Sequence, residues 1–485
     1  MYPVPLVRPI EGEPVSPEQS GEQEEWGDIQ PPVQKEIADL QKQGFNVRVV
    51  RPEQEVEDPD TKGRVQHAID ERIGIAYGLA SSVGSDLPNG RQLSDDVLER
   101  RKEKIVRRTF VNLLFDPEVH PAGAEWLKFS KRAVALGVLY GARDARTISD
   151  AYATTDLDAK LFDGKSAAEV MEERGNSRLL PQYREFFASD AAIEDDTDQY
   201  GLTSADYLRH VVDSYAVRDR GAMAREAIVD HFSSSASGRK EGINMVSLGC
   251  GAADPIYATI GALERNGLRV DKAHLIDGDP VALAAAKAAG EDYYSRRYDI
   301  KDLGEKIKPA LHDLLRDNLT DRIDPQSADV VDLLGLFEYF PAKVTASGLV
   351  QNIVAKKLGK RRPPVAGSLA TSLAYNPAAD LLGSVRDIMR PGGMIVFGNM
   401  LKDRPDQEFF DKVWPKLEQR SIGEVLDVIS AAGYNLEDVE VDVPEGGVYA
   451  VYKIKIPETQ ADGRYRRSAA WQVGRRVLGK LAPRY

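Results

Sequence analysis

The chain has 485 residues, enough for two or three domains, and its hydrophobic fraction of 42% is sufficient for a sizeable core. Its formal net charge of −13 argues against broad nucleic-acid binding, because neutralising phosphates requires a surplus of lysine and arginine. The single cysteine, Cys250, excludes an intrachain disulfide and fits a reducing compartment.

Residues 1–32 are rich in proline and glutamate and are expected to form a flexible arm. They lack the basic start and apolar core of a secretory signal, so no signal peptide is expected. No apolar run reaches the roughly 18 residues of a transmembrane helix. These features predict a cytoplasmic protein.

Residues 33–235 are predicted to form a mainly α-helical domain. In the segment LSDDVLERRKEKIVRRTFVNLLFDP, Ser94 can cap a helix, and Pro117 lies just past its end. Strand signals are scarce in this region. We expect the domain to cover a cofactor pocket or to form the contact of a homodimer. Further helices are expected at residues 123–140, 166–174, 204–213 and 217–232.

A different pattern begins after residues 233–242, SSSASGRKEG, which we interpret as a linker. Short apolar runs then alternate with helical stretches, which is typical of parallel strands joined by crossover helices. Strands are expected at residues 244–248, 273–276, 294–298, 328–334 and 394–398. Two later runs, LEDVEVDV and VYAVYKIKI, are separated only by PEGG and must pair antiparallel. Residues 236–457 are therefore predicted to be an α/β domain with a Rossmann-like, doubly wound, mostly parallel sheet and a terminal antiparallel hairpin.

Two basic segments accompany this domain. Residues 355–364, AKKLGKRRPP, lie in a connection longer than a crossover helix needs and are expected to form an exposed loop. The alternative is a dock for an anionic carrier or acyl substrate. The basic tail, residues 458–485, allows the same two interpretations.

The segment with the clearest chemical meaning is NMVSLGCGAADP, residues 244–255. Gly249 and Gly251, placed after a strand, let backbone N–H groups and the next helix N-terminus approach a ligand, although a plain tight connection is the alternative. Asp277 ends the following strand, where a carboxylate can accept hydrogen bonds from a ribose diol. A dinucleotide site would want a third glycine where Asp254 stands, because a carboxylate there repels a pyrophosphate. S-adenosylmethionine fits better, since it has no phosphate and carries a sulfonium and an α-ammonium.

These motifs resemble those of class I S-adenosylmethionine-dependent methyltransferases over residues 217–456. VSLGCGAADP and HLIDGDPVAL are similar to the family's first two motifs, and MRPGGMIVFGN is similar to the turn before its fifth strand. The terminal hairpin matches the family's reversed last strand, which dinucleotide-binding domains lack. The resemblance implies a set of cofactor-binding residues: Gly249, Cys250, Gly251, Asp254, Asp277, Gly278, Asp299, Ile300 and Leu336.

Within this set the resemblance places the cofactor's methionine part beside Gly249 and Gly251, its ribose at Asp277, and its adenine amine at Asp299. The chain departs from the family's pattern at Ser247, where many members carry an acid. How the ammonium end is held is therefore open. Asp254 is one substitute, with helix capping as its alternative, whereas Asp279 followed by Pro280 is interpreted as a helix N-cap.

Three further segments, LLGLFEYFP, GGMIVFGNM and VWPKLEQRSIGEVLDVISAAGY, resemble a bacterial subgroup connected with biosynthesis of a 3-hydroxypalmitic acid methyl ester. This resemblance implies methyl transfer to a carboxyl or hydroxyl group of a small-molecule or carrier-bound acyl substrate, or of a natural product. Residues after the fourth and fifth strands should face the methyl group. The catalytic candidates are Tyr339, Glu338 and Asn399, with packing or turn roles as the alternative.

Four further residues, one tryptophan and three arginines, have two interpretations each. Trp414 and Arg420 are candidates for a lid in which Arg420 pairs with an anionic substrate. The alternative is a packed helix with a surface arginine. Arg218 and Arg220 are candidates for binding the carboxylate of the cofactor, and the alternative is that they are solvated charges on a helix.

The six histidines show no metal-ligand spacing, so no metal site is expected. No histidine lies near the fourth-strand motif, which favours a carboxylate or another easily ionised acceptor. The alternatives to a methyltransferase are a non-catalytic S-adenosylmethionine-binding or assembly protein and, less favoured, an NAD-dependent oxidoreductase.

Overall fold

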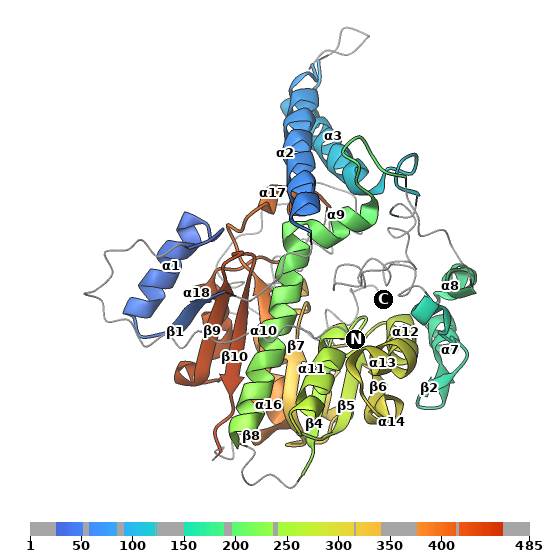
Figure 1. Cartoon of the computed structure of the whole chain (residues 1–485), viewed down its shortest axis with the longest axis vertical. Helices are drawn as coiled ribbons and strands as arrows, with labels where there is room; N and C mark the ends of the chain where they lie inside the picture. The colour runs from blue at the N-terminus through green and yellow to red at the C-terminus, as the bar shows by residue number, and fades with distance from the viewer. Residues whose placement is uncertain are drawn as a thin grey trace, which may run out of the picture.

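The computed structural model (Figure 1) describes residues 26–51, 58–84, 92–121, 123, 150–188, 196–235, 241–314, 317–340, 376–413 and 417–458. Several expectations lie outside these ranges: most of the arm, nearly all of the helix at 123–140, the basic loop, the basic tail and Trp414. Among the helices of the described ranges, none combines the length and apolar character needed to cross a membrane.

The described residues build an eight-stranded sheet in the order β1-β9-β10-β8-β7-β4-β5-β6. β10 runs antiparallel to both of its neighbours, β8 and β9, and the other neighbouring pairs are parallel. The predicted mostly parallel α/β sheet is therefore confirmed. The strands are β1 (Asn46–Val50), β4 (Ile243–Leu248), β5 (Val270–Asp277), β6 (Ile307–Leu311), β7 (Ala328–Leu333), β8 (Met389–Met400), β9 (Val439–Pro444) and β10 (Tyr449–Lys455).

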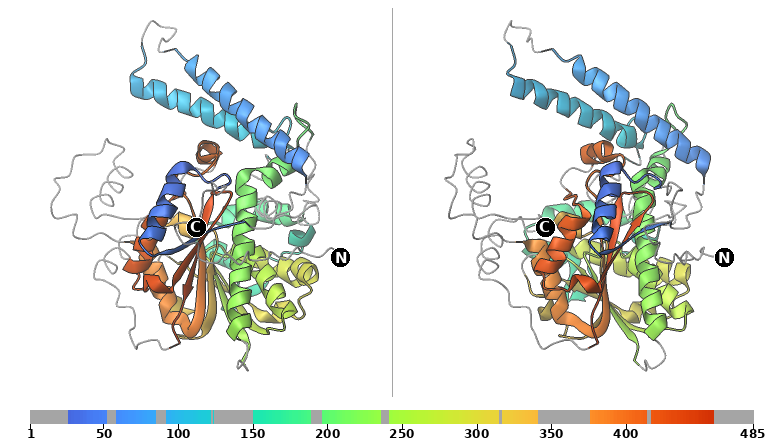
Figure 2. Two further views of the ribbon diagram at one scale, coloured as in Figure 1. Left: turned by 60° about the vertical axis from the view of Figure 1, so that its left-hand side comes forward. Right: turned by 90° about the vertical axis from the view of Figure 1, so that its left-hand side faces the viewer.

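Helices cover both faces of this sheet (Figures 1 and 2). Successive strand residues point to opposite faces, so Met245 joins one hydrophobic core and Val246 the other. The first core is closed by α10 (Val212–Ser235), α11 (Asp254–Arg265), α12 (Pro280–Ala289), the π-helix η3 (Gly290–Tyr294), α13 (Ser295–Tyr298) and α14 (Leu303–Lys306). The second is closed by α1 (Pro31–Lys42), α16 (Pro377–Ile388), α18 (Ile422–Ala431) and the 3₁₀ turns η4 (Leu319–Asp321) and η6 (Leu436–Asp438).

The strand predicted at residues 294–298 is wrong, because this segment is helical in η3 and α13. Its aromatic residues recur with the spacing of a helix turn, and Tyr294 and Tyr298 stack with ring centroids 6.0 Å apart. The third parallel strand is instead β6, whose sequence IKPAL has only one fully buried residue. Pro309 is tolerated there because β6 is an edge strand.

The region before residue 236 contributes to the sheet as well as carrying helices. β1, which the sequence analysis did not predict, pairs parallel with β9 and buries Val47. Arg48 on β1 donates two hydrogen bonds to Asp442 of β9. The expected helices at 166–174, 204–213 and 217–232 are found as α7 (Ala167–Glu173), α9 (Ser204–His210) and α10.

A helical hairpin projects from the body (Figure 2). It consists of α2 (Pro59–Ser81) and α3 (Asp95–Phe115), which share a small core with α9 and α17 (Gln407–Val413). α3 follows Ser94 as expected, although no capping bond from the Ser94 side chain is found within the described residues. The chain then forms the β2–β3 ribbon (Lys160–Phe162 and Lys165–Ser166), α7, the 3₁₀ turn η1 (Ser177–Leu179) and α8 (Leu180–Ala188).

Candidate functional site

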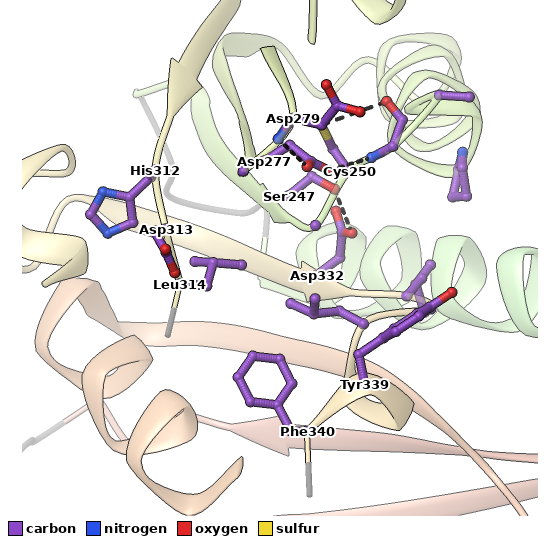
Figure 3. Close-up of a pocket in the computed structure, with 18 of the residues that line it drawn as sticks. Ser247, Cys250, Asp277, Asp279, His312, Asp313, Leu314, Asp332, Tyr339 and Phe340 are labelled. Carbon is purple, nitrogen blue, oxygen red and sulfur yellow. Dashed lines mark hydrogen bonds between the residues drawn. The ribbon is translucent and has the colours of Figure 1, made fainter. Parts of the chain in front are cut away.

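A cavity of about 720 Å³ opens at the carboxyl ends of β4, β5, β6 and β7 (Figure 3). Strand order reverses between β4 and β7: the chain runs outward from β4 through β5 to β6 and then returns to β7 on the other side. Ligands of open α/β sheets bind at such a reversal, because the connecting loops separate there. The cavity is therefore the candidate site of this fold.

The glycine turn after β4 forms one wall. Gly249 and Gly251 line the cavity and adopt φ angles of +64° and +50°, a left-handed conformation that favours glycine. A Cβ atom on Gly249 would lie 2.7 Å from Cδ1 of Leu336, whereas one on Gly251 would meet no atom within 4 Å. Between them, burial raises the pKa of the Cys250 thiol well above its ordinary value, so the thiol is neutral.

These two glycines allow a matched test. Gly251→Ala should lower the free energy of unfolding by about 1–2 kcal/mol, the cost of a left-handed non-glycine residue. Gly249→Ala should lower it by about 1–3 kcal/mol more, because its Cβ also overlaps Leu336. Urea unfolding of both variants measures the difference between their free energies of unfolding. Adding Leu336→Ala to Gly249→Ala should make this difference smaller, because the overlapping side chain is then removed. Equal losses in the two single variants would contradict the proposed close packing.

Asp277, at the end of β5, holds this turn in place. Its Oδ2 accepts a hydrogen bond from Gly251 N (3.0 Å), and its Oδ1 accepts one from Asp279 N (2.9 Å). Burial raises the pKa of Asp277, while these backbone donors oppose the rise. Asp279 caps α12 through Val281 N (2.9 Å), which confirms its interpretation as an N-cap.

Three of the expected cofactor residues lie away from the cavity lining. Asp254 is the buried first residue of α11 and accepts a hydrogen bond from the Tyr298 hydroxyl (3.1 Å), so it neither lines the cavity nor occupies the cap position, which is held by Ala253. Asp299 is an exposed residue at the end of α13, and Ile300 is buried in the first core. Their placement follows from the misassigned strand, since His312 and Asp313 are the residues that follow the third parallel strand and line the cavity.

The catalytic candidates also separate. Tyr339 lines the cavity and is 67% exposed. Glu338 is buried beside Arg220, 3.4 Å from its Nη1, and Asn399 is fully buried on β8. Neither Glu338 nor Asn399 is among the described residues that line the cavity.

The expected lid and cofactor arginines are held inside the fold. Arg420 is 2% exposed and donates hydrogen bonds to the carbonyls of Phe337 and Phe340 and to Asn399 Oδ1. It is therefore a buried structural arginine, and the expectation of a lid at this residue is wrong. Arg220 is 3% exposed, and its guanidinium lies 4.4 Å from the centre of the Tyr449 ring. Arg218 donates to the carbonyl of Arg209 and stacks over Tyr215.

Sequence analysis missed several residues of the cavity. Asp332, near the end of β7, accepts a hydrogen bond from Ser247 Oγ (2.8 Å), and burial raises its pKa from 3.8 to about 7. An acid within the apolar run ADVVDLL was the available signal. His312 is 3% exposed, and burial lowers its pKa, so its ring is neutral. Arg174, which caps the end of α7, donates to the carbonyl of Gly278 (2.6 Å) and brings the N-terminal region into the cavity wall.

The charge of the cavity is negative. The described lining contains one arginine, Arg174, against the carboxylates of Asp277, Asp279, Asp313, Asp317 and Asp332. Within the ranges that the structure describes, no group of three or more histidine, cysteine or acidic residues is placed to hold a metal ion. Such a lining attracts a cationic ligand and repels a phosphate.

No protein-family model matches the sequence. A search of curated proteins finds no significant match either. Among solved structures, the CurJ carbon methyltransferase aligns with a TM-score of 0.37 and 11% identity over 82% of this chain and 92% of that one. An O-methyltransferase family protein from Burkholderia thailandensis aligns at 0.31 and 16% over 70% and 98%. A possible exported protein from Bordetella parapertussis aligns at 0.36 and 14% over 68% and 99%. At such low TM-scores and identities, these similarities assign no activity to this chain.

Proposed function

We propose that this chain is an S-adenosylmethionine-dependent methyltransferase with a small-molecule acceptor. The observation that carries the proposal is the acidic cavity beside the left-handed glycine turn at the reversal of strand order. A nicotinamide dinucleotide would bring a pyrophosphate to the glycine turn, inside this acidic lining, which is unfavourable. The antiparallel strand β10, inserted between β8 and β9, also supports the resemblance to class I methyltransferases over a dinucleotide-binding domain.

The residues of the cavity suit this cofactor as follows. The carboxylate of Asp277 lies at the end of β5, where it can accept from ribose hydroxyls in addition to its backbone donors. Asp313 and Leu314, which follow β6, take the adenine position that sequence analysis gave to Asp299 and Ile300. Gly249 and Leu336, packed against each other, form the wall for the methionine part.

S-adenosylmethionine supplies an electrophilic methyl group for in-line transfer, so the protein's tasks are positioning and exclusion of water. Tyr339 at the exposed mouth is the candidate for contact with the acceptor. Glu338 and Asn399 support this position from within the core rather than contacting substrate. A carboxyl or hydroxyl group of an acyl or natural-product substrate remains the proposed acceptor.

Thermal unfolding with added ligand tests the proposal, because a ligand of the native state raises its stability by about 2.7 kcal/mol at a hundred times its Kd. S-adenosylmethionine and S-adenosylhomocysteine should each raise the Tm, and NAD should not. A rise with NAD alone, or no rise with the two sulfur compounds, would overturn the proposal. Mass spectrometry of metabolite extracts incubated with the enzyme should then detect a gain of one methyl group. Binding without that product would favour the non-catalytic alternative.

A further inference from the structure

Two polar side chains face each other across the strands where the order of the sheet reverses. Ser247 on β4 is the register partner of Asp332 on β7, and the Ser247 hydroxyl donates to Asp332 Oδ1 (2.8 Å; Figure 3). Both residues line the cavity, and they are 4% and 5% exposed. The pair therefore presents a buried carboxylate at the point of the sheet where ligands bind.

Asp332 differs from Asp277 and Asp279 in the hydrogen-bond donors that stabilise its carboxylate. Both oxygens of Asp277 accept backbone N–H groups, and Asp279 caps α12. Asp332 accepts from the Ser247 hydroxyl, and the Leu334 backbone amide also favours its charged form. Burial nevertheless outweighs these donors and raises its pKa to about 7. Within the described part of the chain, no lysine or arginine forms an ion pair with it.

A buried carboxylate without a cationic partner costs free energy, unless a bound ligand supplies the positive charge. The proposed cofactor carries two positive groups. Its α-ammonium is a hydrogen-bond donor, whereas its sulfonium has no proton to donate. Asp332 accepts from Ser247 on β4, whereas Asp277 accepts from Gly251 within the turn, so the two carboxylates contact different parts of this wall. One extended cofactor can place its ribose at Asp277 and its amino-acid end, with the ammonium group, at Asp332.

We propose that Asp332, held by Ser247, binds the α-ammonium group of S-adenosylmethionine. This inference rests on the proposed function. It assigns the contact to the ammonium group that the sequence analysis left open, since Ser247 is not an acid and Asp254 does not line the cavity. The required acid is provided by the neighbouring strand β7 instead of by β4.

The test compares three ligands by calorimetry in the wild-type chain and in Asp332→Asn. S-adenosylmethionine and S-adenosylhomocysteine both carry the α-ammonium, and 5′-methylthioadenosine lacks the whole amino-acid end. Asp332→Asn should weaken the first two ligands by about tenfold or more, the loss expected for a hydrogen bond between charged groups. Its affinity for 5′-methylthioadenosine should stay within about twofold. Asp279→Asn is the matched control, because it also removes a cavity charge and asparagine is an equally good N-cap.

The outcomes separate the two proposals. Equal affinity of wild type and Asp332→Asn for S-adenosylmethionine would overturn this inference and leave the proposed function intact. Weakening of S-adenosylmethionine alone would assign Asp332 to the sulfonium and overturn the ammonium contact. An equal loss in Asp279→Asn would show only a general effect of negative charge. Failure of the wild-type chain to bind either sulfur ligand would overturn the proposed function itself. Asp332→Asn should fold with a Tm no lower than that of the wild type, since the amide keeps the shape and removes a buried charge.

Discussion

Asp277→Ala should abolish measurable binding of S-adenosylmethionine and S-adenosylhomocysteine. The variant removes the expected acceptor for the ribose hydroxyls, and it also releases the backbone N–H groups of Gly251 and Asp279. Hydrogen bonds to a charged group contribute about 1.5–3 kcal/mol each, so losing the two bonds from the ribose hydroxyls predicts a Kd increase of roughly a hundredfold or more. Calorimetry and the ligand-induced Tm shift both measure this loss.

The control for this prediction is Asp271→Ala on the same strand. Asp271 is exposed, pairs with Arg269 and lies at the opposite end of β5 from the cavity. Its replacement should leave cofactor affinity unchanged and alter the free energy of unfolding by less than about 0.5 kcal/mol. An intact ligand-induced shift in Asp277→Ala, with the protein folded, would show that the ribose assignment is wrong.

Local patterns predicted much of the sheet. The runs around Met245 and Val330 are buried on both faces of the sheet and therefore read as continuous apolar strands. The glycines after β4 mark a turn whose left-handed φ angles favour glycine. Such features depend on a few consecutive residues, so a sequence reading can find them.

The missed features depend on residues that are distant in sequence. Ser247 and Asp332 are 85 positions apart, and only the pairing of β4 with β7 brings them together. β1 joins the sheet through β9, nearly 400 residues later. The misassigned segment at Tyr294–Tyr298 has a different cause, because aromatic residues favour both strands and buried helices. This error led the sequence analysis to assign the adenine contact to Asp299, whereas the proposed function assigns it to Asp313.

Arg420 illustrates how a basic residue in a candidate motif can support a site without touching a ligand. Its guanidinium is buried under the 3₁₀ turn η5 (Phe337–Tyr339). It donates to carbonyls at both ends of that turn and packs 5.1 Å from the centre of the Phe337 ring. A third donation, to Asn399 (3.0 Å), ties the turn to β8. The turn carries Tyr339, so Arg420 determines where the proposed acceptor contact lies.

Arg420→Met should therefore lower the free energy of unfolding by about 3–5 kcal/mol, because it leaves three buried carbonyl oxygens without this donor, at about 1–3 kcal/mol each. Methionine fills much of the volume, so the loss reports the unsatisfied carbonyls rather than a cavity. Arg386→Met is the matched control, since Arg386 is half-buried and also donates to a backbone carbonyl, that of Gly433, but through an exposed hydrogen bond. The control should lose less than about 0.5 kcal/mol in urea unfolding. A similar small loss in Arg420→Met, combined with weaker binding of an anionic acceptor, would restore the interpretation of Arg420 as a substrate-pairing residue.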